Sequence, residues 1–324
     1  MKAILFGKDQ SINWTEVETP EPKPGELRIK IEATAVNRAD LMQRAGLYPP
    51  PPGASDIPGL ECVGLVDIVG EGVTGFEIGD RVCALLSAGG YAEYVTCPAD
   101  HCLPVPQEIS NPLDFAGLPE VLATAWLNIF IETQIKAGER VLIHAGASGV
   151  GTAAIQLCHA FNHPCAVTVG TQEKLDRCLA LGANNGAVRQ EENFIDSVKT
   201  WTEGKGFDVI LCPIGGGYLQ DNIKALNTDG RLVIIGLMGG RSADLDIGRL
   251  LVKRIRVIGS TLRSRSQADK SRLLSDLRDN VWPLVLENRI KPIIDHRFPI
   301  NDLDKAYNLI SSNQTFGKVL MTIN

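Results

Sequence analysis

The sequence predicts an α/β protein that combines a doubly wound parallel sheet with a smaller, irregular β domain. Two observations support this fold class. The chain of 324 residues exceeds the usual size of one domain. Its hydrophobic pattern also changes near residue 120, from short strands with frequent turns to short apolar strands that alternate with amphipathic helices. Alternation of the second kind is typical of βαβ units and therefore of a parallel sheet.

The first third of the chain predicts β structure. An alternating strand over residues 27–36 follows a Pro/Gly turn, and residues 62–86 contain several strands separated by glycine turns. The proline-rich stretch 47–59 is unsuited to a helix or to a central strand. These features predict an irregular, barrel-like β domain.

The middle third predicts a Rossmann-type sheet of six strands. The expected strands cover residues 140–145, 164–170, 186–189, 208–216, 231–236 and 256–261, and the expected helices cover 149–161, 171–182, 192–204 and 218–226. A long amphipathic helix over 269–289, a strand within 291–300, a helix over 302–313 and a closing strand over 317–323 do not continue the repeat. We therefore expect residues 1–120 and 267–324 to form one domain and residues 121–266 to form the other.

Composition narrows the functional classes. The net charge of −6 is mild and both signs are mixed along the chain, which argues against nucleic acid or an anionic membrane as the main partner. Neither a secretory signal nor an apolar run of membrane-spanning length is present, so we expect a cytoplasmic protein. The eight cysteines contain no CxxC pair and are expected to be reduced thiols.

The strongest local motif is HAGASGVG at residues 144–151, between an expected strand and an expected helix. Gly146 and Gly151 suit the tight turn and the close packing of helix on strand, although serine replaces glycine at position 148 of a GxGxxG pattern. The main-chain amides of Ser148, Gly149, Val150 and Gly151 are predicted to bind the pyrophosphate of a dinucleotide. A plain βα turn is the alternative.

The end of the second expected strand indicates the cofactor. NAD-preferring folds carry Asp or Glu there, whereas this strand ends at Gly170 and Thr171. Lys174 follows one helical turn later, and Arg189 ends the next strand. Cations and hydroxyls suit the 2′-phosphate of NADPH. Alternatively, Lys174 is a solvated helix residue.

Several longer motifs carry a family resemblance. The segments AVNRADLMQRAGLYPPPPGASDIPGLE, GVTGFEIGDRV, GGYAEYV, LIHAGASGVGTAAIQL and FGKVLM resemble the medium-chain dehydrogenase/reductase superfamily. Within it, the chain is similar to the zinc-independent, zeta-crystallin-like quinone oxidoreductases, closest to the branch of the p53-inducible quinone oxidoreductase. The resemblance covers essentially the whole chain and implies a GroES-like catalytic domain formed by both chain ends.

The resemblance also implies roles for individual residues. Asn37 and Tyr48 are expected beside the nicotinamide and the acceptor as catalytic residues, with Asn37 also binding the cofactor; a turn-forming Asn and an aromatic anchor of the proline loop are the alternatives. A homodimer is expected to form through the sixth Rossmann strand, residues 256–261. Further cofactor contacts are implied for Thr124, Gly236, Leu237, Met238, Thr261, Leu262, Arg263 and Lys318.

A zinc site is not expected. Zinc-using relatives carry a Gly-His-Glu triplet, but this chain has Leu60 in place of the histidine, and Asp40 with Glu61 alone does not make a zinc site. The group of Cys97, His101 and Cys102 matches no standard zinc spacing, and structural roles are expected for it.

Three functional hypotheses follow. The first is NADPH-dependent quinone reduction, with one-electron transfer and ortho-quinones preferred. The second is reduction of an activated C=C bond in an enone, enal or enoyl thioester, which needs a proton donor such as Tyr48. The third is a cofactor-binding protein with a structural or RNA-binding role. Fold alone does not decide among them.

Overall fold

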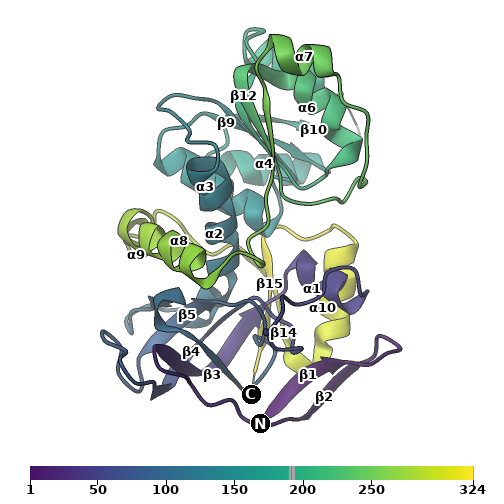
Figure 1. Cartoon of the computed structure of the whole chain (residues 1–324). Helices are drawn as coiled ribbons and strands as arrows, with labels where there is room; N and C mark the ends of the chain where they lie inside the picture. Colours follow the sequence, from purple (N-terminus) through teal and green to yellow (C-terminus); the bar gives the residue numbers. More distant parts are fainter. Residues whose placement is uncertain (190, 192–193, 324) are drawn as a thin grey trace. The chain divides into compact units, whose positions relative to one another are not determined.

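A computed structural model describes residues 1–189, 191 and 194–323 of the chain, which form two units. Unit 1 comprises Met1–Ala123, Leu262–Pro283 and Pro292–Asn324, and unit 2 comprises Thr124–Thr261 and Leu284–Lys291 (Figure 1). The boundaries at 123/124 and 261/262 lie a few residues from the expected 120/121 and 266/267. Leu284–Lys291 belongs to unit 2 because the side chain of Gln156 bonds both the main-chain N and the main-chain O of Lys291.

Unit 2 contains the predicted doubly wound sheet. Within the described residues its six strands are all parallel, in the order β10-β9-β8-β11-β12-β13. This order is that of dinucleotide-binding folds, and it places β8 and β11 at the point where the winding direction reverses. The strands are β8 (Val141–His144), β9 (Cys165–Val169), β10 (Asn185–Val188), β11 (Phe207–Cys212), β12 (Leu226–Ile234) and β13 (Arg256–Gly259).

Helices cover this sheet because its strands are apolar on both faces; every residue of β8 and of β9 is buried. The helices are α3 (Gly149–Ala160), α4 (Gln172–Ala180), α5 (Phe194–Trp201), α6 (Leu219–Ala225) and α7 (Ile247–Val252). The expected helix over 192–204 corresponds to α5, and Glu192 and Asn193 lie outside the described residues.

Unit 1 contains a larger, mostly antiparallel sheet in the order β14-β15-β3-β4-β5-β7, with β6 also paired to β3. The strands are β3 (Glu26–Ala35), β4 (Glu61–Val69), β5 (Arg81–Leu85), β6 (Tyr94–Pro98), β7 (Cys102–Pro104), β14 (Ile294–Pro299) and β15 (Lys318–Thr322), and a separate hairpin joins β1 (Lys2–Phe6) and β2 (Ile12–Glu16). As predicted, the C-terminal strand returns to this unit, where Leu320 pairs with Ala35 of β3. The architecture is GroES-like.

The helical elements of unit 1 include α1 (Arg38–Arg44), which directly follows β3, and α10 (Leu303–Ser311). The single long helix expected over 269–289 is wrong. The chain forms α8 (Gln267–Asn280) and then a separate short α9 (Trp282–Leu286). Pro283 explains the break, since proline lacks an N–H and is tolerated only in the first turn of a new helix.

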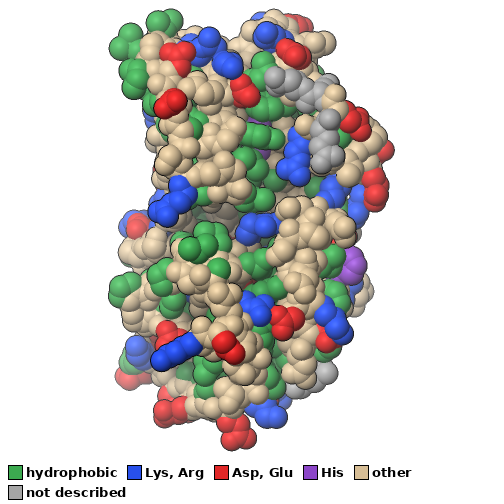
Figure 2. Space-filling view, turned by 90° about the vertical axis from the view of Figure 1, so that its right-hand side faces the viewer, with side chains coloured by type: hydrophobic (Ala, Val, Ile, Leu, Met, Phe, Trp, Pro, Cys, Tyr) green, Lys and Arg blue, Asp and Glu red, His purple; other side chains and the backbone are tan. Residues whose placement is uncertain are grey.

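The surface shows no long-range charge segregation on the face drawn in Figure 2, where acidic and basic side chains are interspersed. No helix among the described residues combines the length and the apolar character needed to cross a membrane.

Candidate active site

A buried polar network surrounds Asn37 in unit 1, at the junction of β3 and α1. Lys318, the first residue of β15, and Glu61, the first residue of β4, flank the end of β3, because both strands pair with it. The Lys318 Nζ lies 2.8 Å from Glu61 Oε1, and the two side chains are 5% and 0% exposed. An ion pair this deeply buried must be satisfied by further hydrogen bonds to be tolerated.

Those further bonds fix the orientation of Asn37. Its Nδ2 donates to Glu61 Oε1 at 2.9 Å and to the Ala35 carbonyl at 3.3 Å, and its Oδ1 accepts from Lys318 Nζ at 2.7 Å. Both amide hydrogens of Asn37 are therefore committed to protein acceptors. The remaining lone pair of Oδ1 can accept a hydrogen bond, for example from a cofactor hydroxyl, but the side chain has no hydrogen left to donate to a substrate oxygen.

Lys318 is likewise saturated. Besides Asn37 and Glu61, its ammonium donates to the Val36 carbonyl at 2.9 Å, so its three N–H groups have three protein acceptors. The sequence prediction that Lys318 contacts the cofactor stays a prediction, and such a contact would have to displace one of these bonds. The other oxygen of Glu61 accepts from the main-chain N of Glu120 at 2.9 Å, in the first turn of α2 (Pro119–Trp126).

Asp40 forms a second buried layer behind Asn37. Its Oδ2 accepts from the Asn37 main-chain N at 2.7 Å and from the Tyr91 hydroxyl at 2.8 Å, whereas its buried Oδ1 has no hydrogen-bond partner. Burial raises the pKa of the Asp40 carboxyl to about 6, partly offset by the bonds from Asn37 and Tyr91. Asp40 therefore fixes the main chain at Asn37.

Tyr48 lies in unit 1 within the proline-rich loop, half-buried, with the guanidinium of Arg263 over its ring at 5.4 Å. Burial raises the pKa of the Tyr48 phenol above its ordinary value, and the nearby Glu120 carboxylate raises it further. The phenol is therefore neutral at physiological pH and retains a proton that it can donate.

The glycine loop of unit 2 has the geometry expected of a dinucleotide-binding turn. Ser148 caps α3, its hydroxyl accepting from the Gly151 main-chain N at 3.0 Å. A Cβ at position 151 would lie 2.4 Å from the Ala145 carbonyl oxygen, so only glycine fits. The amides of Gly149 and Val150, in the first turn of α3, have no intrahelical acceptor and are available to an anion. The loop fits a pyrophosphate.

A buried histidine fixes the strand beneath this loop. His144 ends β8, and its ring nitrogens bond the Thr168 hydroxyl on β9 at 2.9 Å and Asn222 Oδ1 on α6 at 2.6 Å. Because Asn222 Oδ1 can only accept, Nε2 carries the proton, and Nδ1 then accepts from Thr168. Burial lowers the pKa of His144 to about 4, so the ring is neutral. Sequence analysis had assigned His144 no role.

The end of β9 gathers the residues predicted to select the cofactor. Thr171 caps α4 by accepting from the Lys174 main-chain N at 3.3 Å. Arg189 follows β10, and its main-chain N bonds the Val169 carbonyl at 3.0 Å. A Cβ built on Gly170 would lie 3.6 Å from Arg189 Nη2. The structure therefore brings Arg189 beside Gly170, at the N-terminus of the helix that carries Lys174.

The remaining predicted cofactor residues lie at the expected chain positions, and their roles stay predictions. Thr124 is on α2; Gly236, Leu237 and Met238 follow β12; and Thr261 and Leu262 follow β13. Leu237 and Met238 are exposed in unit 2. Arg263, by contrast, directs three of its hydrogen bonds to acceptors in unit 1.

The sequence analysis did not predict that two acidic residues near Asn37 hold its side chain and main chain in place. Glu61 was considered only as a metal ligand, and Asp40 likewise, although both hold Asn37 in place. The available signal was a charged residue within an apolar strand: Glu61 stands between Leu60 and Cys62, and Lys318 precedes Val319. Charged residues in such positions are seldom fully buried unless they are paired.

The described residues contain no cluster of three or more His, Cys, Asp or Glu side chains that could hold a metal ion. At Glu61, the Lys318 ammonium already neutralises the carboxylate and would repel a cation. Cys97 and Cys102 lie side by side, with their sulfur atoms 3.4 Å apart, whereas His101 bonds the Gln267 carbonyl.

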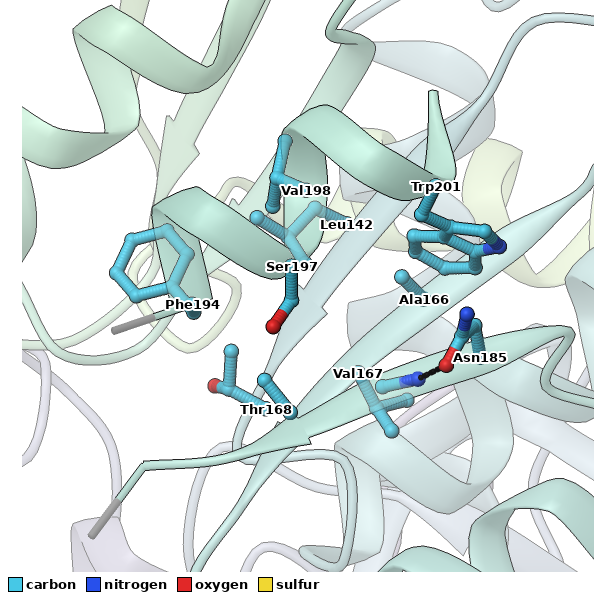
Figure 3. A pocket seen from close by; sticks show the side chains of 11 residues that line it. Leu142, Ala166, Val167, Thr168, Asn185, Phe194, Ser197, Val198 and Trp201 are labelled. Atoms are coloured by element: carbon cyan, nitrogen blue, oxygen red, sulfur yellow. Dashed lines mark hydrogen bonds between the residues drawn. The ribbon is translucent and has the colours of Figure 1, made fainter. Parts of the chain in front are cut away.

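A separate small pocket in unit 2 lies between α5 and the sheet (Figure 3). Its lining is largely apolar, with Phe194, Val198 and Trp201 contributed by α5 and the hydroxyls of Ser197 and Thr168 facing its interior. None of the predicted site residues is among those that line it. We interpret it as a packing gap beneath α5.

Comparisons with known proteins agree with both units. The alcohol dehydrogenase GroES-like domain family matches residues 23–107, and the zinc-binding dehydrogenase family matches residues 149–278. Quinone oxidoreductases from Sus scrofa and Rattus norvegicus are 30% and 29% identical, over 95% of this chain and 92% of each relative.

Solved structures show the same fold over the whole chain. A mycobacterial protein solved in complex with NADPH is 27% identical, with a TM-score of 0.87 over 99% of this chain and 100% of that one. An NAD-dependent alcohol dehydrogenase is 29% identical, with a TM-score of 0.86 over 100% of both chains. These two neighbours do not distinguish NADPH from NADH.

The GroES-like sheet of unit 1 and the dinucleotide-type sheet of unit 2 define a medium-chain dehydrogenase/reductase. Within that superfamily of oxidoreductases, the chain belongs to the zeta-crystallin-like quinone oxidoreductases.

Proposed function

We propose that the protein reduces quinones with NADPH without a catalytic metal, delivering single electrons and preferring ortho-quinones. The observation that carries this proposal is the arrangement around Asn37, whose amide hydrogens are both bonded to protein acceptors. A side chain held in this way orients its neighbours through one acceptor atom and supplies no proton. Electron or hydride transfer to a quinone needs orientation and exclusion of water more than acid–base machinery.

The cofactor, when bound, supplies the reducing equivalents, and residues of the chain hold it. The amides of Gly149 and Val150 would bind the pyrophosphate, and the Asn37 Oδ1 lone pair would accept from a hydroxyl on the nicotinamide side. Lys174 and Arg189 would bind the 2′-phosphate through charge-assisted hydrogen bonds. The position of Arg189 beside Gly170, with no acid at the end of β9, supports NADPH over NADH.

This cofactor preference can be tested with Lys174→Ala and Arg189→Ala. Loss of one charge-assisted contact should lower kcat/KM for NADPH by about 10- to 100-fold and leave the value for NADH within about twofold. Arg177→Ala, an exposed basic residue on the same helix α4, is the matched control. Equal losses with both cofactors would contradict the assignment.

The acceptor is tested by NADPH oxidation with a panel of ortho- and para-quinones, with cytochrome c reduction reporting one-electron products. Turnover of quinones coupled to cytochrome c reduction supports the proposal. If enones are reduced and quinones are not, the protein is instead a C=C reductase. The observation that favours this second candidate is the neutral phenol of Tyr48, which can protonate a carbanion.

We also propose that two chains pair through residues 256–261. Within the described residues β13 is a sheet edge, and Val257 on it is 39% exposed. The neighbouring α7 exposes Ile247, Leu251 and Val252, and a group of hydrophobic side chains marks the upper end of the face in Figure 2. Exposed apolar edges of this kind are usually covered. Sedimentation of the native protein and of Val257→Lys would test this: a dimer should become a monomer.

A further inference from the structure

The guanidinium of Arg263 joins three separate segments of unit 1. Its Nε donates to the Ser87 carbonyl at 2.7 Å, its Nη2 to Gln43 Oε1 at 2.7 Å, and its Nη1 to the Tyr48 carbonyl at 3.2 Å. The side chain is also stacked over the Tyr48 ring, with 5.4 Å between the guanidinium carbon and the ring centroid. Arg263 is only 4% exposed, so these bonds are made largely out of water.

The loop that carries Tyr48 has few other means of attachment. Ala45, Gly46 and Leu47 before it are exposed, and Leu47 is 71% exposed. Prolines occupy all four positions 49–52 after it, and proline has no N–H to donate to the rest of the unit. The N–H groups of the buried Arg263 guanidinium therefore supply the hydrogen bonds to unit 1 that the main chain of this loop does not donate.

The main chain of Arg263 is held by a second buried cation, Lys270. The Nζ of Lys270, on α8, donates to the Arg263 carbonyl at 2.7 Å and to the Ser87 hydroxyl at 2.6 Å. Lys270 is 4% exposed, so both cations are fixed in the same buried layer. Because main chain and side chain of Arg263 are anchored separately, the guanidinium has a defined position from which to hold the loop.

We propose that Arg263 is a positioning residue for Tyr48. It fixes the position of the Tyr48 ring and thereby determines which quinones or other electron acceptors the enzyme can reduce. The part concerning acceptors rests on the proposed function and on the place beside the acceptor that the sequence predicts for Tyr48. The part concerning the loop does not. Lysine cannot replace Arg263, because a single ammonium cannot reach three divergent carbonyl acceptors and stack on a ring at once.

The test combines hydrogen exchange with kinetics on Arg263→Lys. Mass spectrometry of a peptide spanning residues 43–55 should show exchange at least about tenfold faster than in the native protein, as expected for loss of a charge-assisted bond. The kcat/KM for a quinone should fall about tenfold, with the KM for NADPH within about twofold. Arg272→Lys, an exposed residue of α8, is the matched control and should change neither.

Gln43→Ala serves as a second variant, since it removes one acceptor of the fork and leaves Arg263 in place. Gln43→Ala should show a smaller increase in the exchange of residues 43–55 and a smaller fall in kcat/KM for the quinone. If Arg263→Lys does not fold, this variant still decides the test. Unchanged exchange of residues 43–55 in both variants would overturn the proposal, as would a KM for NADPH that rises as much as the acceptor KM. A native enzyme that turns over no quinone would refute the proposed function alone, because the exchange result would still decide the role of Arg263.

Discussion

Replacing Lys318 by methionine tests whether the polar network around Asn37 is held together as described. The variant leaves the Glu61 carboxylate buried without its countercharge, and Asn37 Oδ1 without its donor. Removing one partner of a buried ion pair typically costs about 3–5 kcal/mol of unfolding free energy, because the remaining charge is desolvated and unpaired. We expect Lys318→Met to fall in that range, a large fraction of the stability of an ordinary domain.

The assay is equilibrium urea unfolding followed by circular dichroism and by tryptophan fluorescence. A single free energy is fitted only if the two transitions coincide, since a protein of two units can unfold in more than one step. Lys305→Met is the matched control. Lys305 is 67% exposed and pairs with Asp302, so its loss should change stability by less than about 0.5 kcal/mol.

A double variant separates the unpaired charge from lost packing. Lys318→Met combined with Glu61→Gln replaces the unpaired Glu61 carboxylate by a neutral amide, so at least about half of the loss should be recovered. A Lys318→Met variant that loses less than about 1 kcal/mol would refute this reasoning. So would a double variant as unstable as the single one.

Two further predictions concern buried titratable groups. Burial raises the folded-state pKa of Asp40 from 3.8 to about 6, so its stabilising contribution is present below the unfolded pKa and is lost as the pH rises through 6. The unfolding free energy of the native protein minus that of Asp40→Asn should therefore decrease by about 1.3 kcal/mol between about pH 5 and 7 in urea titrations; a difference independent of pH would contradict it. All eight cysteines are buried, and burial raises the pKa of Cys178 to about 12, so a thiol reagent near pH 7.5 should find fewer than about one reactive group in the native protein and eight in denaturant.

The fold could be predicted largely from the sequence because its signals are local. Apolar runs such as residues 140–145 alternate with amphipathic helices, and that alternation alone implies parallel strands. The break between α8 and α9 was missed because the amphipathic pattern continues through it, although Pro283 was the local indication.

The candidate site was less predictable because its contacts are distant in the sequence. Lys318 and Asn37 bond across 281 positions, and Arg263 and Tyr48 across 215. Motifs identified Asn37 and Tyr48 themselves, but no periodicity shows that a lysine on the last strand saturates the amide of Asn37. Only the pairing of β15 with β3 places these groups together.

Tyr48 separates the two candidate reactions because its phenol stays neutral and retains a proton that only the C=C reduction needs. Tyr48→Phe keeps the ring stacked under the guanidinium and removes only the hydroxyl. If the protein transfers electrons to quinones, orientation is retained and kcat should stay within about threefold of the native value. If it reduces C=C bonds, loss of the general acid should lower kcat by about 10²- to 10⁴-fold. Because the pKa of Tyr48 is raised, native activity should not change between about pH 6 and 8 through its ionisation. A large loss of quinone turnover in Tyr48→Phe would show that the hydroxyl takes part in the chemistry, and the role of orientation argued from Asn37 would then be insufficient.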